Sequence, residues 1–222
     1  MEKTVFIADQ GTRYGRKISD TFLANNYRVI STGVVKDGDS IDNQHADQGM
    51  LISLKWNCFS PFSSKNVILG LRPYQDVRYS VIIFSSAAAA SSAEEKPLYR
   101  QNHSDIQKML DYNLRSQILI THDLIAELSK HHSSYLFFVL ENSDSENPGR
   151  SFLKSFINTI LADQDNLNIT INAFEAGKET PEAFAEYFYL AVQDKALKTK
   201  GKWFRQFQMP SFLNSISMPG SH

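Results

Sequence analysis

Residues 4–22 read TVFIADQGTRYGRKISDTF, and the two patterns inside this stretch decide the fold. The run Thr4–Ala8 is almost wholly apolar, which is typical of a strand buried on both faces of a sheet. Apolar residues then recur at helical spacing, at Tyr14, Ile18 and Phe22. The stretch therefore predicts a buried strand, a turn that contains glycine, and an amphipathic helix that ends near Asn25.

The same alternation continues along the chain. Six further runs predict strands: Tyr27–Thr32, Met50–Trp56, Tyr79–Phe84, Tyr135–Leu140, Asn168–Ala173 and Lys202–Phe207. Amphipathic stretches predict helices at Ser64–Leu71, Ser104–Leu128, Ser151–Leu161 and Pro181–Val192. One face of the longest helix is marked by Ile106, Leu110, Leu114, Ile118, Thr121 and Ile125. Strict alternation with apolar central strands predicts an α/β fold of Rossmann type, a doubly wound parallel sheet covered by helices on both faces.

Length and charge limit the remaining choices. The 222 residues, 42% of them hydrophobic, suffice for one core, and we expect one domain at residues 1–207 with a tail at 208–222. The 23 basic and 24 acidic residues give a net charge of −1, which offers no electrostatic footprint for nucleic acid. We therefore expect no nucleic acid as a partner.

Other site types find little support in the sequence. The single cysteine, Cys58, excludes an intramolecular disulfide and is expected to be a small core residue. The six histidines show no metal-ligand spacing, and we expect no metal site. No run approaches the roughly 20 apolar residues of a membrane span or forms a signal-peptide core, so the expected location is the cytoplasm.

Ligands of doubly wound sheets bind at the carboxyl ends of the strands. The loops to inspect are therefore those after Ala8, Thr32, Phe84, Leu140 and Ala173. The loop after Phe84 begins with SSAAAASS, residues 85–92. This run is either low-complexity sequence or a tight strand-to-helix crossing beside a ligand.

Four segments of the chain resemble the short-chain dehydrogenases/reductases. They are IADQGTRYGRKIS (7–19), VIIFSSAAA (81–89), DYNLRSQILITHDLI (111–125), and NITINAFEAG (168–177) with the following TPEAFAEYFYLAV and KGKWF. They correspond to the glycine-rich turn, the fourth strand, the central helix and the C-terminal third of that family. The resemblance implies a nicotinamide-dependent oxidoreductase ancestry.

The pteridine reductases, which include dihydromonapterin reductases, are the subgroup that this chain resembles most. Their turn carries an arginine, and here Arg13 and Gly15 match it within ADQGTRYG. The resemblance implies NADPH as cofactor, a pterin-like substrate, and an Arg13 that favours the 2′-phosphate. It also implies cofactor contacts from Gly11, Arg13, Gly15, Ser86 and Lys154. Alternatively, Arg13 is a solvated residue of a first helical turn.

Asp9 departs from the family's pattern, because the first glycine of the turn aligns with it. A carboxylate about 5 Å from a diphosphate charge is repelled by roughly 3 kcal/mol at an effective dielectric constant near 20. We therefore expect NADPH binding to be weak or absent. Asp9 can instead serve as a helix N-cap, a role that is common for aspartate.

The catalytic segment departs as well. The family uses a tyrosine as general acid and a lysine four residues later, whereas this chain has Arg150 and Lys154 at that spacing. An arginine does not give up its proton and cannot replace a phenol as acid. The two cations either form an anion-binding pair or lie on a solvated helix face. The resemblance leaves Lys154, Asn113 and Ser143 as candidate catalytic residues.

The substrate lid of the family is also missing, because Gly177 is followed almost at once by Thr180-Pro181 and a helix. Two hypotheses remain open. The chain is a reductase homologue with weak or lost activity, or a non-catalytic Rossmann module that binds a partner protein. Family members often pair through the two long helices, here Ser104–Leu128 and Ser151–Leu161, so we expect a homo-oligomer or a complex with a paralogue.

Overall fold

The computed structural model describes residues 3–9, 11–34, 50–60, 62–74, 77–84, 102–131, 134–141, 148–194 and 196–205. Its centre is one parallel sheet of seven strands in the order β3-β2-β1-β4-β5-β6-β7. The strands are β1 (Lys3–Ala8), β2 (Tyr27–Val34), β3 (Leu51–Trp56), β4 (Val77–Phe84), β5 (Ser134–Leu140), β6 (Ile169–Glu175) and β7 (Trp203–Phe204). The predicted α/β fold with a parallel sheet is confirmed.

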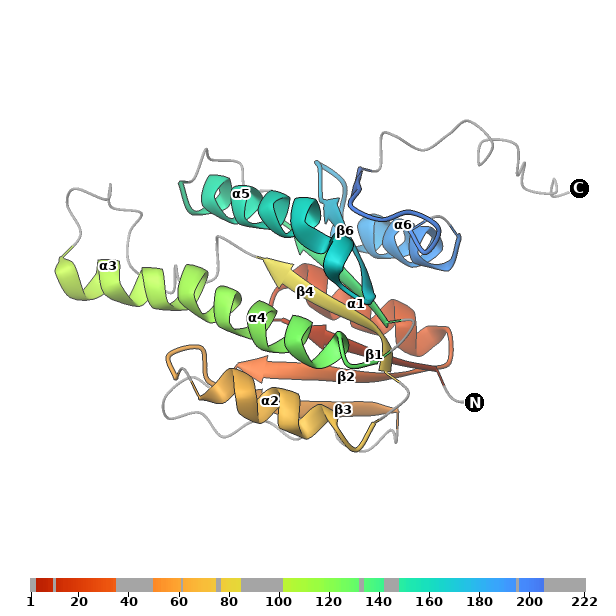
Figure 1. Ribbon diagram of the computed structural model, residues 1–222, viewed down its shortest axis with the longest axis horizontal. Coiled ribbons are helices and arrows are strands. Elements are labelled where there is room, and N and C mark those ends of the chain that lie inside the picture. The colour runs from red at the N-terminus through yellow and green to blue at the C-terminus, as the bar shows by residue number, and fades with distance from the viewer. Residues whose placement is uncertain are drawn as a thin grey trace, which may run out of the picture.

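Helices cover both faces of this sheet (Figure 1). They are α1 (Arg13–Ala24), α2 (Ser63–Leu71), α3 (His103–Leu110), α4 (Ser116–Leu128), α5 (Pro148–Asp163) and α6 (Pro181–Asp194). Helices α1 and α6 pack on one face, and α2, α4 and α5 pack on the other. Because side chains alternate along a strand, Val5 and Ile7 contact the first layer while Phe6 and Ala8 contact the second.

The strand that begins near Thr4 lies inside the sheet, as predicted. It pairs with β2 on one side and β4 on the other, and Ile18 and Phe22 of α1 are buried against the core. Thr12 caps this helix, since its hydroxyl accepts a hydrogen bond of 2.9 Å from the Gly15 N–H. The alternative in which Asp9 is the N-cap is wrong, because Asp9 lies three residues before Thr12.

The boundary of β6 matters for function. The predicted strand stopped at Ala173, whereas β6 continues to Glu175 and brings a carboxylate to the carboxyl edge of the sheet. The next strand, β7, is described at Trp203–Phe204. The expected end of that strand at Phe207, the tail at 208–222 and the small-residue run at 85–92 lie outside the described residues.

The long helix predicted after β4 is not uniformly α-helical. A π-helical segment, Asp111–Arg115, joins α3 to α4. A π turn closes hydrogen bonds from i to i+5, so it rotates the residues that follow relative to an α-helix. The predicted apolar face is therefore only partly the buried one. Leu110 is exposed, whereas the buried residues of α4 are Ser116, Gln117, Ile120, Thr121, Leu124 and Leu128.

Two smaller expectations concern the rest of the chain. Cys58 is buried in the core layer that contains α2, as expected for a small apolar residue. Among the described helices, none has the length and apolar character that crossing a lipid bilayer requires.

Candidate functional site

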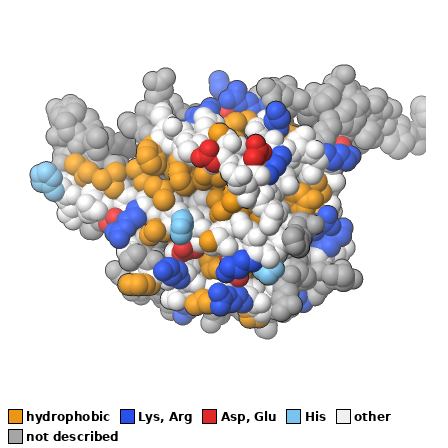
Figure 2. Space-filling model, viewed as in Figure 1, with side chains coloured by type: hydrophobic (Ala, Val, Ile, Leu, Met, Phe, Trp, Pro, Cys, Tyr) orange, Lys and Arg blue, Asp and Glu red, His pale blue; other side chains and the backbone are white. Residues whose placement is uncertain are grey.

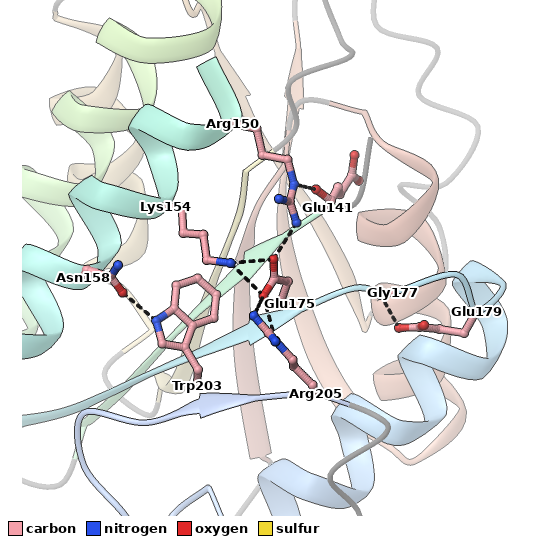
Figure 3. A network of polar contacts seen from close by, with 9 residues as sticks. All are labelled: Glu141, Arg150, Lys154, Asn158, Glu175, Gly177, Glu179, Trp203 and Arg205. Atoms are coloured by element: carbon pink, nitrogen blue, oxygen red, sulfur yellow. Dashed lines mark hydrogen bonds and ion pairs between the residues drawn. The ribbon is translucent and has the colours of Figure 1, made fainter. Parts of the chain in front are cut away.

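Four charged side chains meet at the carboxyl edge of β6 (Figure 3). The Glu175 carboxylate accepts a hydrogen bond from Arg150 Nη2 at 2.6 Å and from Arg205 Nε at 2.8 Å. Lys154 Nζ donates to both carboxylate oxygens, at 2.9 and 3.1 Å. We call these four residues the Glu175 cluster. It joins α5, the end of β6 and the residue after β7.

Helix geometry explains how α5 supplies two of these cations. Positions four apart lie one turn above each other, so Arg150 and Lys154 share the face that is turned toward β6. Neither side chain lies on a fully solvated helix face, so that expectation is wrong. Their mutual repulsion is offset by the carboxylate between them.

Lys154 is held from a second side. Its ammonium group lies 5.7 Å from the centroid of the Trp203 ring, within the range of a cation–π contact. The Trp203 indole N–H in turn donates to Asn158 Oδ1 at 2.7 Å. The lysine is therefore fixed between a carboxylate and an indole ring.

The electrostatics of the cluster keep Glu175 ionised. Burial of this carboxyl group raises its pKa, but hydrogen bonds from Lys154, Arg150 and Arg205 outweigh burial and lower the pKa to about 2. A group with that pKa carries no proton near neutral pH. Glu175 therefore cannot act as a general acid near neutral pH. Arg150 cannot take that role either, because an arginine does not give up its proton.

The turn after β1 is filled by the chain itself. The buried Asp9 carboxylate accepts hydrogen bonds from the Thr12 N–H at 3.1 Å to each oxygen. The Asp9 backbone is bound to β2, because the Thr32 hydroxyl accepts from the Asp9 N–H at 2.9 Å and donates to the Asp9 carbonyl at 2.7 Å. A backbone N–H near the start of α1, the kind of donor that faces a pyrophosphate in this fold class, is thus directed at an internal carboxylate.

Two glycines of the turn have distinct roles. Gly11 has φ of +82°, a conformation that side chains rarely adopt. Gly15 lies directly against Asp9, so a Cβ atom at this position would overlap the carboxylate. Arg13 is exposed at the first position of α1. Gly15, which resembles a glycine of a cofactor turn, therefore accommodates an acidic side chain.

The only tyrosine of α1, Tyr14, lies close to the same edge. Its hydroxyl donates to the Glu179 carbonyl at 3.4 Å. Burial raises the pKa of Tyr14 above its usual value of 10.0, and the carboxylates of Glu179 and Glu141 raise it further. The family's catalytic tyrosine has its pKa lowered by a lysine, so Tyr14 has the opposite environment.

The segment between β6 and α6 is short, as the sequence predicted. It comprises residues 176–180, and the Gly177 N–H donates to Glu179 Oε1 at 2.8 Å within it. No long lid can be formed by so short a connection. Nothing in this loop resembles a cover that would exclude water from a reacting centre.

The remaining predicted site residues are distributed as follows. Lys154 is in the Glu175 cluster, and Asn113 lies in the π segment, where its side chain is outside the described atoms. Ser143 and Ser86 lie outside the described residues. Glu175 and Arg205 were missed, although an acidic residue that ends an apolar strand, two residues before Gly177, was a visible signal. Within the described ranges, no group of His, Cys, Asp or Glu side chains could hold a metal ion.

Comparison with known proteins gives matches of structure only. No protein-family model and no curated relative matches the sequence. Serine dehydrogenase from Escherichia coli superposes with a TM-score of 0.69 at 13% identity, covering 91% of this chain and 96% of that one. YwfH, an NADPH-dependent reductase of bacilysin biosynthesis, gives 0.68 at 12% identity, covering 93% and 98%.

A third structure, a short-chain dehydrogenase/reductase from Serratia marcescens, gives a TM-score of 0.67 at 13% identity and covers 91% of this chain and 95% of that one. The likeness thus extends over nearly the whole length of each protein, while the identity is too low to transfer an activity. The chain has the fold of the short-chain dehydrogenases/reductases.

Proposed function

We propose that the chain is a short-chain dehydrogenase/reductase homologue that has lost reductase activity and acts as a non-catalytic Rossmann-type subunit. The observation that carries the proposal is the Glu175 cluster. The lysine that corresponds to the family's catalytic lysine donates to Glu175, and the neighbouring arginine occupies the position of the acid. No proton donor is therefore present at the acid position, and two donors of the lysine are directed at an internal carboxylate.

The turn after β1 supports the same proposal. The Asp9 carboxylate occupies the side of α1's N-terminus on which a pyrophosphate would be bound, and it already receives the Thr12 N–H. A diphosphate would have to displace this carboxylate or lie against its charge. On that ground NADPH binds weakly or not at all.

An apolar groove beside α5 supports a partner-binding role. A shallow apolar groove of about 290 Å³ lies between the long helix and α5, and its lining includes Leu110, Leu114, Ile118 and Phe152. Figure 2 shows the hydrophobic side chains that gather along this face. We propose that a second copy or a paralogue covers it, in the cytoplasm that the sequence leads us to expect.

A second candidate is a weakly active NADPH-dependent reductase of pterins. The observation that favours it is the exposed position of Arg13 at the start of α1, next to the left-handed Gly11. An arginine there remains accessible to a 2′-phosphate. The lack of a lid and of a general acid counts against efficient turnover.

The test is a reductase assay with NADPH and a dihydropterin, combined with thermal unfolding in the presence of NADPH, NADH or neither. We expect no NADPH consumption above background and no shift of Tm with either nucleotide. A stabilisation of about 2.7 kcal/mol, expected for a ligand at 100 times its Kd, would contradict the proposal for the cofactor. NADPH-dependent turnover of the dihydropterin would contradict the proposal that reductase activity is lost.

A further inference from the structure

We propose that Arg150, Lys154 and Arg205 form a binding site for a small phosphate-type oxyanion at the carboxyl edge of β6. The inference rests on the proposed function in one respect, because it assigns Arg150 and Lys154 to ligand binding and not to hydride-transfer chemistry. The internal Glu175 carboxylate organises the site, and the ligand binds on the outer side of the three cations.

The charge of the cluster is unbalanced. Three cations surround one carboxylate, which leaves a formal excess of two positive charges. Glu141 contributes its backbone carbonyl to Arg150 at 3.2 Å, while its carboxylate raises the pKa of Tyr14 on the other side. Among the residues that the structure describes, cations at this site outnumber carboxylates by three to two even when Glu141 is counted. Partly buried charges are normally paired, so an external anion is expected to complete the cluster.

The two guanidinium groups still have donors to offer. Each carries five N–H bonds. Arg150 uses Nε for the Glu141 carbonyl and Nη2 for Glu175, and Arg205 uses Nε and Nη2 for Glu175. Among the described residues, Nη1 of each arginine has no hydrogen-bond acceptor. Because both groups are already oriented by Glu175, little side-chain freedom is lost when an oxyanion binds.

The N-terminus of α5 adds to the positive field. Arg150 is the third residue of this 16-residue helix, whose first turn contains no acidic residue. The helix dipole is positive at this end, so it also favours an anion that binds beside Arg150. Helix α1 provides the contrast, since Asp9 supplies an internal anion to its N-terminal end.

The site is open to solutes from one side. The exposed fraction of the side chains is 21% for Arg150, 34% for Lys154 and 51% for Arg205. In Figure 3, Arg150 and Lys154 from α5 and Arg205, the residue after β7, converge on Glu175. Arg205 is the most exposed of the three cations, so its replacement suits a test of ligand binding.

The experiment is an isothermal titration of the full-length protein with inorganic phosphate, with methyl phosphate and acetate as further arms at constant ionic strength. We expect saturable binding of phosphate and methyl phosphate but not of acetate. Arg205→Gln should weaken binding about tenfold or more, as for loss of a charge-assisted hydrogen bond. Arg205→Lys keeps the positive charge but not the planar guanidinium group. Its affinity for phosphate should lie between those of the unaltered protein and Arg205→Gln. The matched control Lys198→Gln removes an exposed cation elsewhere and should bind as the unaltered protein does.

Absence of saturable phosphate binding, an equal Kd in Arg205→Gln, or acetate binding as tight as phosphate binding would overturn the proposal. Circular dichroism of each variant checks that it is folded, and Arg205→Lys remains informative if Arg205→Gln is not. The proposed function fails on a different result, NADPH turnover, which this titration does not measure.

Discussion

The Lys154 ammonium group bridges both carboxylate oxygens of Glu175, at 2.9 and 3.1 Å, across the boundary between α5 and β6. Two of the three N–H donors of this ammonium group are thereby directed at Glu175, which leaves one for any other ligand. The contact between Lys154 and Glu175 also connects α5 to β6, so it affects the stability of the fold as well as the function of the site.

The first prediction concerns Glu175→Gln. The substitution leaves three partly buried cations without their carboxylate, and loss of a partner from such a pair costs several kcal/mol when it is fully buried. Since the cations are partly exposed, we expect about 2–3 kcal/mol of destabilisation, or a Tm lower by about 4–12 °C. Asp194→Asn, which breaks the exposed pair with Lys198, is the matched control and should change Tm little. Equal Tm values for the two variants would refute a stabilising role for the cluster.

The second prediction is a loss of stability in acid. Hydrogen bonds from three cations outweigh burial and lower the pKa of Glu175 from 4.5 to about 2. A depressed pKa gives stability that is fully present above about pH 4.5 and is lost as the pH falls toward 2. The contribution should fall by about 1–2 kcal/mol between pH 6 and pH 3, because solvent screens the partly exposed cations. Urea unfolding of the unaltered protein and of Glu175→Gln at pH 6 and pH 3 isolates the contribution of Glu175 to the free energy of unfolding. The other carboxyl groups contribute equally in the two proteins. Parallel curves would show that the pKa of Glu175 is not depressed.

The third prediction concerns the turn after β1. Asp9→Asn keeps an acceptor for the Thr12 N–H and removes the negative charge, so it should improve NADPH affinity by up to about 3 kcal/mol. Asp9→Gly should improve it as well, provided that the turn keeps its shape. Fluorescence titration with NADPH measures the change, and Asp20→Asn, on the exposed side of α1, is the control. Tight NADPH binding to the unaltered protein, with no gain in Asp9→Asn, would contradict this explanation.

The fourth prediction is that Arg150→Tyr does not restore catalysis. The variant regains a phenol at the acid position, but Lys154 remains with Glu175, Asp9 remains in the turn, and residues 176–180 remain too short for a lid. We expect turnover of a dihydropterin with NADPH well below about 1 s⁻¹, the lower end of ordinary enzymes. Faster turnover by the unaltered protein would mean that another residue, such as Tyr112 or Ser143, supplies the proton.

The fifth prediction concerns assembly. If the apolar groove between the long helix and α5 is a dimer interface, light scattering at micromolar concentration should give twice the mass of the 25.2 kDa chain. Phe152→Glu places a charge in the groove and should shift the protein to monomer. Leu190→Glu, at an exposed leucine of α6, is the control and should remain dimeric. A monomer in all three proteins would leave the groove to a different partner chain.

Much of the fold was predictable because it depends on local patterns. The apolar runs at Thr4–Ala8 and Tyr79–Phe84 are buried strands, and the short connection to Pro181 removes the lid. Hydrophobic periodicity carries this information within windows of a few residues. The π segment at Asp111–Arg115 was not predictable in the same way, because its composition is compatible with an ordinary α-helix.

By itself, the sequence determined which residues stand at the turn and on the helix: Asp9 where the resemblance places a glycine, and Arg150 four residues before Lys154. Only the tertiary structure decided what these groups contact. Glu175 is 21 residues from Lys154 and 30 from Arg205, and they meet because β5, β6 and β7 are parallel neighbours whose carboxyl ends share one edge. Strand order is a global property of packing. No local sequence pattern therefore indicates that Arg150 and Lys154 bind the carboxylate of Glu175.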